Sequence, residues 1–173
     1  SWVWIKERSS SSDHMLFDQP RGVEKYISSN LANAEQTSNQ MLTAFDSDGF
    51  TIGPSNDLND PGQNYVAWNW KANGQGSSNT DGTINTTYTS ANTTSGFSIV
   101  SYSGSGSNGT FGHGLLETPN LIIVKCRNVA QNWAVQHSAY GPTKYTYLNS
   151  ANEARTTGAT AFWNNTAPTT STV

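Results

Sequence analysis

The amino-acid sequence predicts an all-β protein, an antiparallel β-sandwich or jelly roll with less than about 15% helix and no parallel βαβ unit. Three observations support this fold class. Short runs rich in aromatic and β-branched residues recur along the chain, turn-forming pairs separate them, and helical periodicity is scarce. The chain is only 34% hydrophobic and 12% charged, but its six Trp, seven Tyr and six Phe indicate a folded protein, because disordered chains are poor in aromatic residues.

The expected strands follow one another at short intervals. In chain order they are residues 2–6, 15–17, 49–53, 65–70, 83–89, 97–103, 121–127, 133–137 and 145–148. The turn-forming pairs between them are Asp48-Gly49, Asn73-Gly74, Asp81-Gly82, Asn108-Gly109 and Gly141-Pro142. Residues 29–43 have a weak helical stripe, but this segment equally suits a loop with one turn of helix.

Three of the expected strands are apolar on both faces, at least over their centres. They begin at Trp2, Tyr65 and Leu121. Strands of this kind belong in the middle of a layered structure, not at its edge. We therefore expect Trp68 to be largely buried, so that its replacement by alanine would cost about 3–5 kcal/mol.

An internal repeat is the most specific pattern in the sequence. A shift of about 119 residues brings four separate blocks into register. Residues 4–8 fall on 123–127, Lys25-Tyr26 on Lys144-Tyr145, Asn30 on Asn149, and Ala32-Asn33 on Ala151-Asn152. We interpret residues 1–70 as the back part of one unit, 71–96 as a linker with a possible edge strand, and 97–173 as the front part of the next unit. Incomplete units leave sheet edges open, so we expect the two parts to complete each other or further chain contacts to close them.

The order of the motifs is also distinctive. One half of the pattern is carried by residues 4–8, 21–23, 45–50 and 65–70, and the following half by 96–102, 112–115, Pro119 and 122–125. Over nearly the whole chain this pattern resembles a repeated domain of unknown function found in predicted structural proteins of marine tailed phages. The resemblance implies a concanavalin-like or lectin-like sandwich and a virion surface or tail-fibre role. It supplies no catalytic residues, and this sequence departs from the usual pattern mainly in stopping within a unit.

The sequence contains no convincing catalytic or metal-binding motif, and we expect a protein without enzymatic activity or a cofactor. Asp46 and Asp48 form a carboxylate pair of the kind that glycosidases use, but Asp-Ser-Asp-Gly is also an ordinary turn. His14, His113 and His137 lie in different strands or loops and lack zinc-binding spacing. Calcium is the metal that the sequence fits best, because oxygen ligands gather in one region, although their spacing fits no known calcium loop. They are Asp46, Asp48, Asp57, Asn59 and Asp60.

Carbohydrate binding is a more natural function for this composition. Aromatic faces stack on the C–H surfaces of sugars, while Asn, Asp and His side chains bond the hydroxyl groups. The candidate ligand-binding residues, all within one short stretch, are Trp133, His137, Tyr140, Tyr145 and Trp163. The alternative for each aromatic residue is a place in the hydrophobic core.

The charge and hydropathy of the sequence exclude two classes of partner from our expectations. The net charge is −3 and no cluster of Lys or Arg is present, so nucleic acid is not an expected partner. No apolar run approaches the roughly 20 residues of a membrane span, so membrane insertion is not expected either. Cys126 is the single cysteine, and its apolar strand setting predicts a buried, inert thiol.

These observations predict a virion structural protein on the particle surface or in the extracellular space. The expected roles are a tail fibre, a spike or a capsid decoration module that contacts host-surface glycans. Other virion proteins, further copies of the same chain and a carbohydrate ligand are the expected partners. The alternatives are a glycan-degrading enzyme on a concanavalin-like sandwich, which requires two acids about 5 to 10 Å apart, and a cellular surface adhesin.

Overall fold

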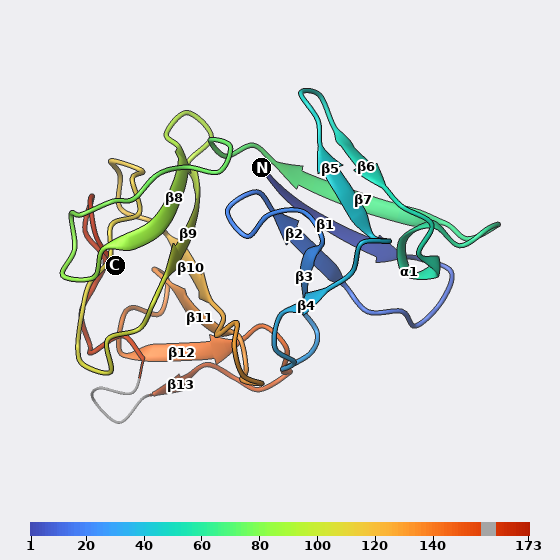
Figure 1. The fold of residues 1–173 in the computed structure, drawn as a ribbon. Helices are drawn as coiled ribbons and strands as arrows, with labels where there is room; N and C mark the ends of the chain where they lie inside the picture. Colours follow the sequence, from blue (N-terminus) through green and yellow to red (C-terminus); the bar gives the residue numbers. More distant parts are fainter. Residues whose placement is uncertain (157–161) are drawn as a thin grey trace.

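The computed structural model describes residues 1–156 and 162–173 (Figure 1). Only 2% of the chain is helical and 35% is in strands, and the strand pairs among the described residues are antiparallel. The predicted all-β fold class is therefore confirmed, and the arrangement is sandwich-like. The elements are β1 (Trp2–Glu7), β2 (Met15–Asp18), β3 (Lys25–Ser28), β4 (Gln36–Thr37), β5 (Leu42–Phe45), β6 (Phe50–Ile52), α1 (Asn56–Asn59), β7 (Tyr65–Trp70), β8 (Thr86–Asn92), β9 (Phe97–Tyr102), β10 (Leu121–Val124), β11 (Ala134–His137), β12 (Lys144–Tyr147) and β13 (Arg155–Thr156).

The first sheet has the strand order β4-β3-β2-β1-β7. Side chains alternate along β1, so Val3 and Ile5 are buried on one face while Trp4 points to the other. The register places Trp4 opposite Leu16 of β2 and opposite Trp68 of β7. Tryptophans of two neighbouring strands therefore share one face of this sheet.

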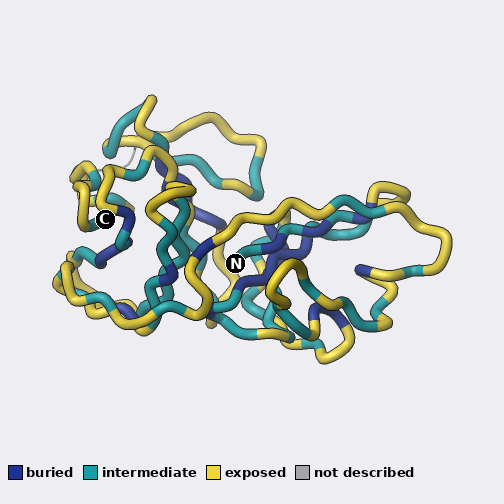
Figure 2. The backbone as a smooth tube through the Cα atoms, turned by 90° about the horizontal axis from the view of Figure 1, so that it is seen from above, coloured by how far each residue is buried: buried dark blue, intermediate teal, exposed yellow. Residues whose placement is uncertain are grey.

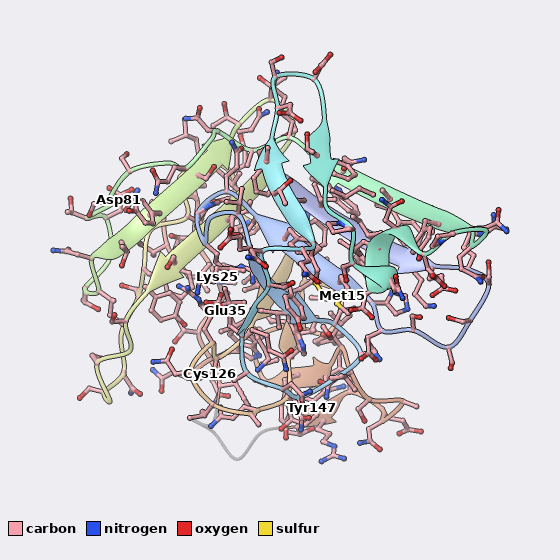
Figure 3. All side chains as sticks on the ribbon, turned by 45° about the vertical axis from the view of Figure 1, so that its right-hand side comes forward. Met15, Lys25, Glu35, Asp81, Cys126 and Tyr147 are labelled. Atoms are coloured by element: carbon pink, nitrogen blue, oxygen red, sulfur yellow. The ribbon has the colours of Figure 1, made fainter. Side chains whose placement is uncertain are left out.

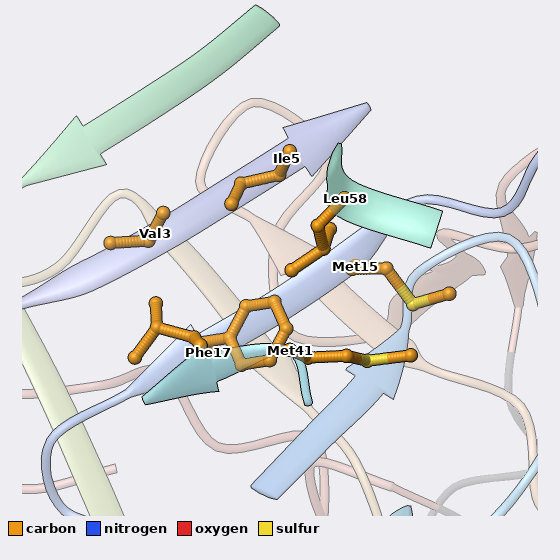
Figure 4. Packing of buried hydrophobic residues seen from close by; sticks show 7 residues of the cluster. Val3, Ile5, Met15, Phe17, Met41 and Leu58 are labelled. Carbon is orange, nitrogen blue, oxygen red and sulfur yellow. The ribbon is translucent and has the colours of Figure 1, made fainter. Parts of the chain in front are cut away.

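The hydrophobic core of the first half lies on the opposite face of the sheet. Figure 4 shows side chains of β1 and β2 packed together with Met41 and with Leu58 of α1. Phe17 is fully buried at its centre. The hairpin formed by β5 and β6 adds Leu42 and its partly buried neighbours to the same cluster. The short helix begins after Ser55, whose hydroxyl oxygen accepts a hydrogen bond from the backbone N–H of Asp57, so Leu58 is held over the sheet.

A separate hairpin, β8 and β9, occupies the segment that joins the two sheets. The predicted edge strand at 83–89 overlaps β8, which lies a few residues further along and pairs with β9, with a shift of register between Thr86 and Tyr88. The approach to β8 depends on Gly76. Its φ of +79° is in the left-handed region, and a Cβ there would lie 2.3 Å from the carbonyl oxygen of Thr89. Only glycine allows the chain to pass so close to the hairpin.

The second sheet has the order β10-β11-β12-β13 and follows the same plan as β1 to β4. The strands β2, β3 and β4 begin at residues 15, 25 and 36, and β11, β12 and β13 begin at residues 134, 144 and 155. The registers agree as well, since Trp2 lies opposite Asp18 and Leu121 lies opposite His137. Among the described residues, β7 has no counterpart in this sheet, so β10 is an edge strand.

The loops of the two sheets make matching contacts. The side-chain oxygen of Asn30 accepts a hydrogen bond from the backbone N–H of His14, and that of Asn149 accepts one from the N–H of Trp133, both at 3.0 Å. A glycine with positive φ follows β2 at Gly22 and follows β11 at Gly141. These contacts are separated by the same interval as the sequence blocks. Residues 157–161, part of the expected second copy, lie outside the described residues.

The two halves meet on the tryptophan-bearing face of the first sheet. Trp133, immediately before β11, packs against Leu16 and Ile27, and Trp2 and Trp4 border this cluster. The indole N–H of Trp133 donates to the carbonyl oxygens of Ser28, at 3.1 Å, and Leu31, at 3.0 Å. The first sheet is thus covered on both faces near β2, whose four residues are all buried. Figure 2 shows the buried parts of the chain in dark blue. This layering accounts for the buried run along β2.

A charged contact also joins the halves. Nε and Nη2 of Arg127 each lie 2.8 Å from a different carboxylate oxygen of Glu35, and Arg21 approaches the same carboxylate at 3.4 Å. The backbone N–H of Glu35, labelled in Figure 3, donates to the carbonyl oxygen of Arg127. Burial alone would raise the pKa of Glu35, but the hydrogen bonds and charges of Arg127 and Arg21 outweigh it and lower that pKa.

This contact predicts a stability difference that depends on pH. A carboxyl group whose pKa is lower in the folded state stabilises the fold above its unfolded pKa, and the contribution disappears as the pH falls through the folded value. We expect Glu35→Gln to lower the free energy of unfolding by about 1–3 kcal/mol at pH 7, because two charge-assisted hydrogen bonds are weakened. Urea unfolding at pH 7 and pH 3 measures the change, which should shrink at pH 3. Glu117→Gln, at an exposed carboxylate, is the matched control, and an equal loss in both variants would contradict the prediction.

Two expectations about strand placement are wrong. The strands β7 and β10 lie at sheet edges, and Trp68 is 44% exposed instead of buried. An edge strand has a neighbouring strand on one side only, so its side chains lack lateral contacts on the open side and remain partly in solvent. The cost of Trp68→Ala is correspondingly smaller than a core value, about 1 kcal/mol. Residues 29–43, which had a weak helical stripe, contain loop and strand segments but no helix.

Candidate functional site

Four tryptophans form a continuous surface on β1 and β7, which we call the tryptophan face: Trp2, Trp4, Trp68 and Trp70. Cross-strand pairing places Trp2 opposite Trp70 and Trp4 opposite Trp68. The ring centroids are 4.5 Å apart in the first pair and 5.7 Å apart in the second. Trp2 and Trp4 are 5.8 Å apart along β1, so the four indoles form one contiguous group.

The outer part of the tryptophan face is open to solvent. Trp68 is 44% exposed and Trp70 is 38% exposed, although both are large apolar side chains. Together with Trp4 they line a shallow hollow of about 270 Å³. Phe97 of β9 stacks on Trp70, with the two ring centroids 6.2 Å apart and the ring planes at 27°. Exposed and contiguous aromatic surface of this kind is typical of a binding site.

His14 is a polar side chain beside the tryptophan face. The indole N–H of Trp4 donates to Nδ1 of His14 at 2.8 Å, and the two rings meet edge to face. Burial and the nearby positive charge of Lys6 lower the pKa of His14, although the carboxylate of Asp13 acts in the opposite direction. A neutral imidazole is what this hydrogen bond requires, because Nδ1 must keep its lone pair. The contact orients Trp4 and fixes one wall of the hollow.

The arrangement suits a ligand that presents flat apolar patches and hydroxyl groups together. Indole faces stack on C–H surfaces, and their electron-rich π-systems favour polarised C–H groups. Sugars carry such surfaces on their rings. The four tryptophans are held by two paired strands, so the platform is ordered before a ligand arrives and little side-chain entropy is lost on binding.

The five residues predicted as a ligand site, Trp133, His137, Tyr140, Tyr145 and Trp163, have different surroundings. Trp133 is only 7% exposed, and its indole N–H is fully used by the first half of the chain. It is a core residue, which is the alternative that the sequence leaves open for each aromatic residue of this group. His137 and Tyr140 lie close together at the end of β11, with ring centroids 6.1 Å apart. The hydroxyl of Tyr140 donates to the carbonyl oxygen of Val135.

Tyr145 and Trp163 have different surroundings. Tyr145 packs against Phe162, at 4.4 Å between ring centroids, and against Tyr147 at 5.2 Å. Trp163 is half-buried, and its indole nitrogen has no hydrogen-bond partner among the described residues. Aromatic residues close in sequence are thus divided among core packing and separate surface clusters.

The carboxylates considered for calcium lie along the β5–β6 hairpin and around α1. Asp46 accepts a hydrogen bond from the hydroxyl of Thr51, which is the ordinary chemistry of a hairpin turn. Within residues 1–156 and 162–173, no group of three or more His, Cys, Asp or Glu residues is placed to hold a metal ion. Cys126 is exposed, so the expectation of a buried thiol is wrong. In the same part of the chain, no helix is long and apolar enough to cross a membrane.

The tryptophan face has a sequence signal of its own, which the predicted ligand site did not include. Tryptophan recurs at i and i+2 in two separate strands, at Trp2 and Trp4 and again at Trp68 and Trp70. Period two places each pair on one face of its strand. The pairing of β1 with β7, which brings residues 58 to 68 positions apart in the chain side by side, has no such local signal.

Fold and surface together define the class: an antiparallel, sandwich-like all-β domain with a partly exposed tryptophan face on β1 and the edge strand β7. The whole chain, residues 1–173, matches the family described as "Domain of unknown function (DUF7483)", and the protein belongs to that family. A search of curated proteins finds no match to this chain, and a search of solved structures finds none either.

Proposed function

We propose that this protein is a non-enzymatic binding and structural module on the surface of a phage particle, as part of a tail fibre, a spike or a capsid decoration, and that its tryptophan face contacts host-surface glycans. The observation that carries the glycan part is the exposure of Trp68 and Trp70 on a rigid edge strand. The virion part rests on the resemblance of the sequence motifs to a repeated domain of predicted structural proteins of tailed phages. A sandwich-like domain in the extracellular space is a fold on which surface binding sites are common.

The tryptophan face supports glycan contact better than the stretch 133–163 does. Its indoles are contiguous and partly exposed, and one of them is oriented by a hydrogen bond to His14. A single shallow site gives weak affinity, because a small apolar hollow buries little of a sugar. Several copies of the chain on one particle would raise the overall avidity by making later contacts intramolecular. The proposal therefore includes other virion proteins and further copies of this chain as partners.

Glycan binding by the purified protein is the first test. We expect Trp68→Ala and Trp70→Ala each to weaken binding to oligosaccharides on a glycan array by at least about tenfold, because each removes a stacking surface worth more than about 1.4 kcal/mol. Tyr145→Ala is the matched control, since it removes an aromatic residue of the rival stretch and should leave binding unchanged. Thermal unfolding of each variant confirms that the fold is kept.

The outcomes separate the parts of the proposal. Loss of binding in Tyr145→Ala with normal binding in Trp68→Ala would place the ligand on the other surface. Binding to no oligosaccharide at millimolar sugar would overturn the glycan contact. Shortened oligosaccharides, detected by mass spectrometry after incubation, would overturn the non-enzymatic part. Gold-labelled antibodies on particles from a lysate that contains this protein test the virion part, and labelling of cell surfaces without particles would contradict it.

A further inference from the structure

The strand β10 occupies in the second sheet the position that β1 occupies in the first. The two strands pair with β11 and β2 in matching registers, and the turns and asparagine contacts that follow also match. β1 has a second neighbour, β7, along its other side for its entire length, from Trp2 opposite Trp70 to Glu7 opposite Tyr65. For β10, the described residues provide a partner only on the β11 side.

The backbone hydrogen bonds identify the groups on the open side of β10. In an antiparallel pair, alternate residues bond to one neighbour and the residues between them face the other way. The backbone N–H of Ser138 donates to the carbonyl oxygen of Asn120, so the even-numbered residues of β10 bond to β11. The N–H and C=O groups of Leu121 and Ile123 therefore point away from β11. In β1 the equivalent groups are those of Trp2 and Trp4, and they face β7. The backbone N–H of Arg8, two further alternate positions along, donates to the carbonyl oxygen of Asn64 on this same side.

The side chains of β10 are more exposed than the equivalent side chains of β1, which has a second neighbouring strand. Trp2 and Trp4 pack against the indoles of β7 and are half-buried. Leu121 and Ile123, at the equivalent positions, are 54% and 40% exposed. The first half of the chain makes a hydrogen bond just after the end of β10, where Nζ of Lys125 donates to the carbonyl oxygen of Ala32. The four residues of β10 include no proline or charge that would block pairing.

An edge of this kind is a template for strand addition, because exposed apolar side chains and unpaired backbone groups lie on the same strand. We propose that β10 accepts an antiparallel strand of the β7 type, with tryptophan or another aromatic residue at alternate positions, from a neighbouring unit of the same family. The position equivalent to Trp70 lies opposite Leu121 and that equivalent to Trp68 lies opposite Ile123. The β7 strand of this chain is already paired with β1, so the donor is a different unit. The inference is independent of glycan binding.

A peptide with the sequence of residues 63–72, which contains β7 and its flanks, tests this pairing. Backbone amide exchange of the intact protein, followed by NMR, reports each strand separately. With the peptide in excess, we expect exchange at the amides of Leu121 and Ile123 to slow by at least about tenfold, because exchange then requires dissociation of the added strand. Exchange at Trp2 and Trp4 should stay unchanged, since β7 of the protein keeps its place.

Two N-methylated peptides provide a matched pair of controls. In β7 the amides of Trp68 and Trp70 face the partner strand, and the amide of Ala67 faces the other way. A methyl group on the Trp68 amide should abolish the protection, whereas one on the Ala67 amide should leave it. Equal protection with both peptides would show non-specific adhesion and overturn the proposal.

A protein variant tests the acceptor side. Leu121→Lys places a charge beside the expected indole and should weaken peptide binding by at least about tenfold, while Leu116→Lys, at an exposed residue outside β10, should not. The absence of any protection at Leu121 and Ile123 with 1 mM unmodified peptide would overturn the inference. Glycan binding by the same protein sample, measured separately, would be unaffected by either result.

Discussion

Replacement of Trp133 by alanine is expected to lower the free energy of unfolding by about 3–5 kcal/mol, the largest loss expected for any residue that joins the two halves. The indole is buried between Leu16 and Ile27 of the first sheet. Its removal leaves a cavity there and deprives two carbonyl oxygens, those of Ser28 and Leu31, of a hydrogen-bond donor. Both effects act at the boundary between the halves, so separation of the halves should accompany the loss.

Two measurements check this expectation. Urea unfolding gives the free-energy change, and amide exchange at β2 and β3 shows whether the contact surface opens. Trp133→Phe is the matched control, because it keeps most of the apolar contact and removes only the N–H donor. It should cost about 1–3 kcal/mol. If Trp133→Ala were as stable as the parent protein, the packing of the second half on the first would be disproved.

The strands β2 and β9 could be predicted from sequence because their side chains alternate between apolar and polar or are continuously apolar. Residues 15–17 and 97–103 match β2 and β9 for this reason. The strands β4 and β13 were missed because each has two residues, all polar and exposed, and their existence depends on pairing with β3 and β12. Such strands have no local signal, since cross-strand hydrogen bonds alone define them.

The edge position of β7 could not be predicted from its continuous apolar sequence, and the reason is physical. Continuous apolar sequence predicts burial on both faces, and this is true of β2, which has layers on both sides. In β7 the same kind of sequence lies at the end of a sheet, and Trp68 and Trp70 remain partly exposed. Local sequence does not distinguish a central apolar strand from an apolar strand at the edge of a sheet. The difference lies in which strands become neighbours.

The candidate site shows the same limit. The candidate site was placed at 133–163 because aromatic residues are frequent there, but their frequency does not show toward which surface each side chain points. Trp133 points into the contact between the halves, whereas Tyr145 packs on Phe162. Alternation within a strand is the more informative signal, because it fixes a common face, and it is what unites Trp2 with Trp4.

Replacement of Phe17 by alanine should cost about 3–5 kcal/mol, comparable with Trp133→Ala but confined to the first half. Phe17 has no exposed surface and lies in β2, opposite Val3 of β1 and beside Met41 (Figure 4). The surrounding strands are held by their own hydrogen bonds, so they cannot collapse fully into the space that the ring leaves.

Phe17→Leu is the matched control, since leucine fills much of the volume and should cost less than half as much. Thermal unfolding and amide exchange measure both variants. The exchange of β1 and β2 should rise in Phe17→Ala, while that of β11 and β12 should change little, because the second sheet has its own pairing and meets the first on the opposite face. Equal loosening of both sheets would show that the two halves unfold as one cooperative body, and that the tryptophan-bearing contact between them couples the cores more tightly than the separate hydrophobic clusters imply.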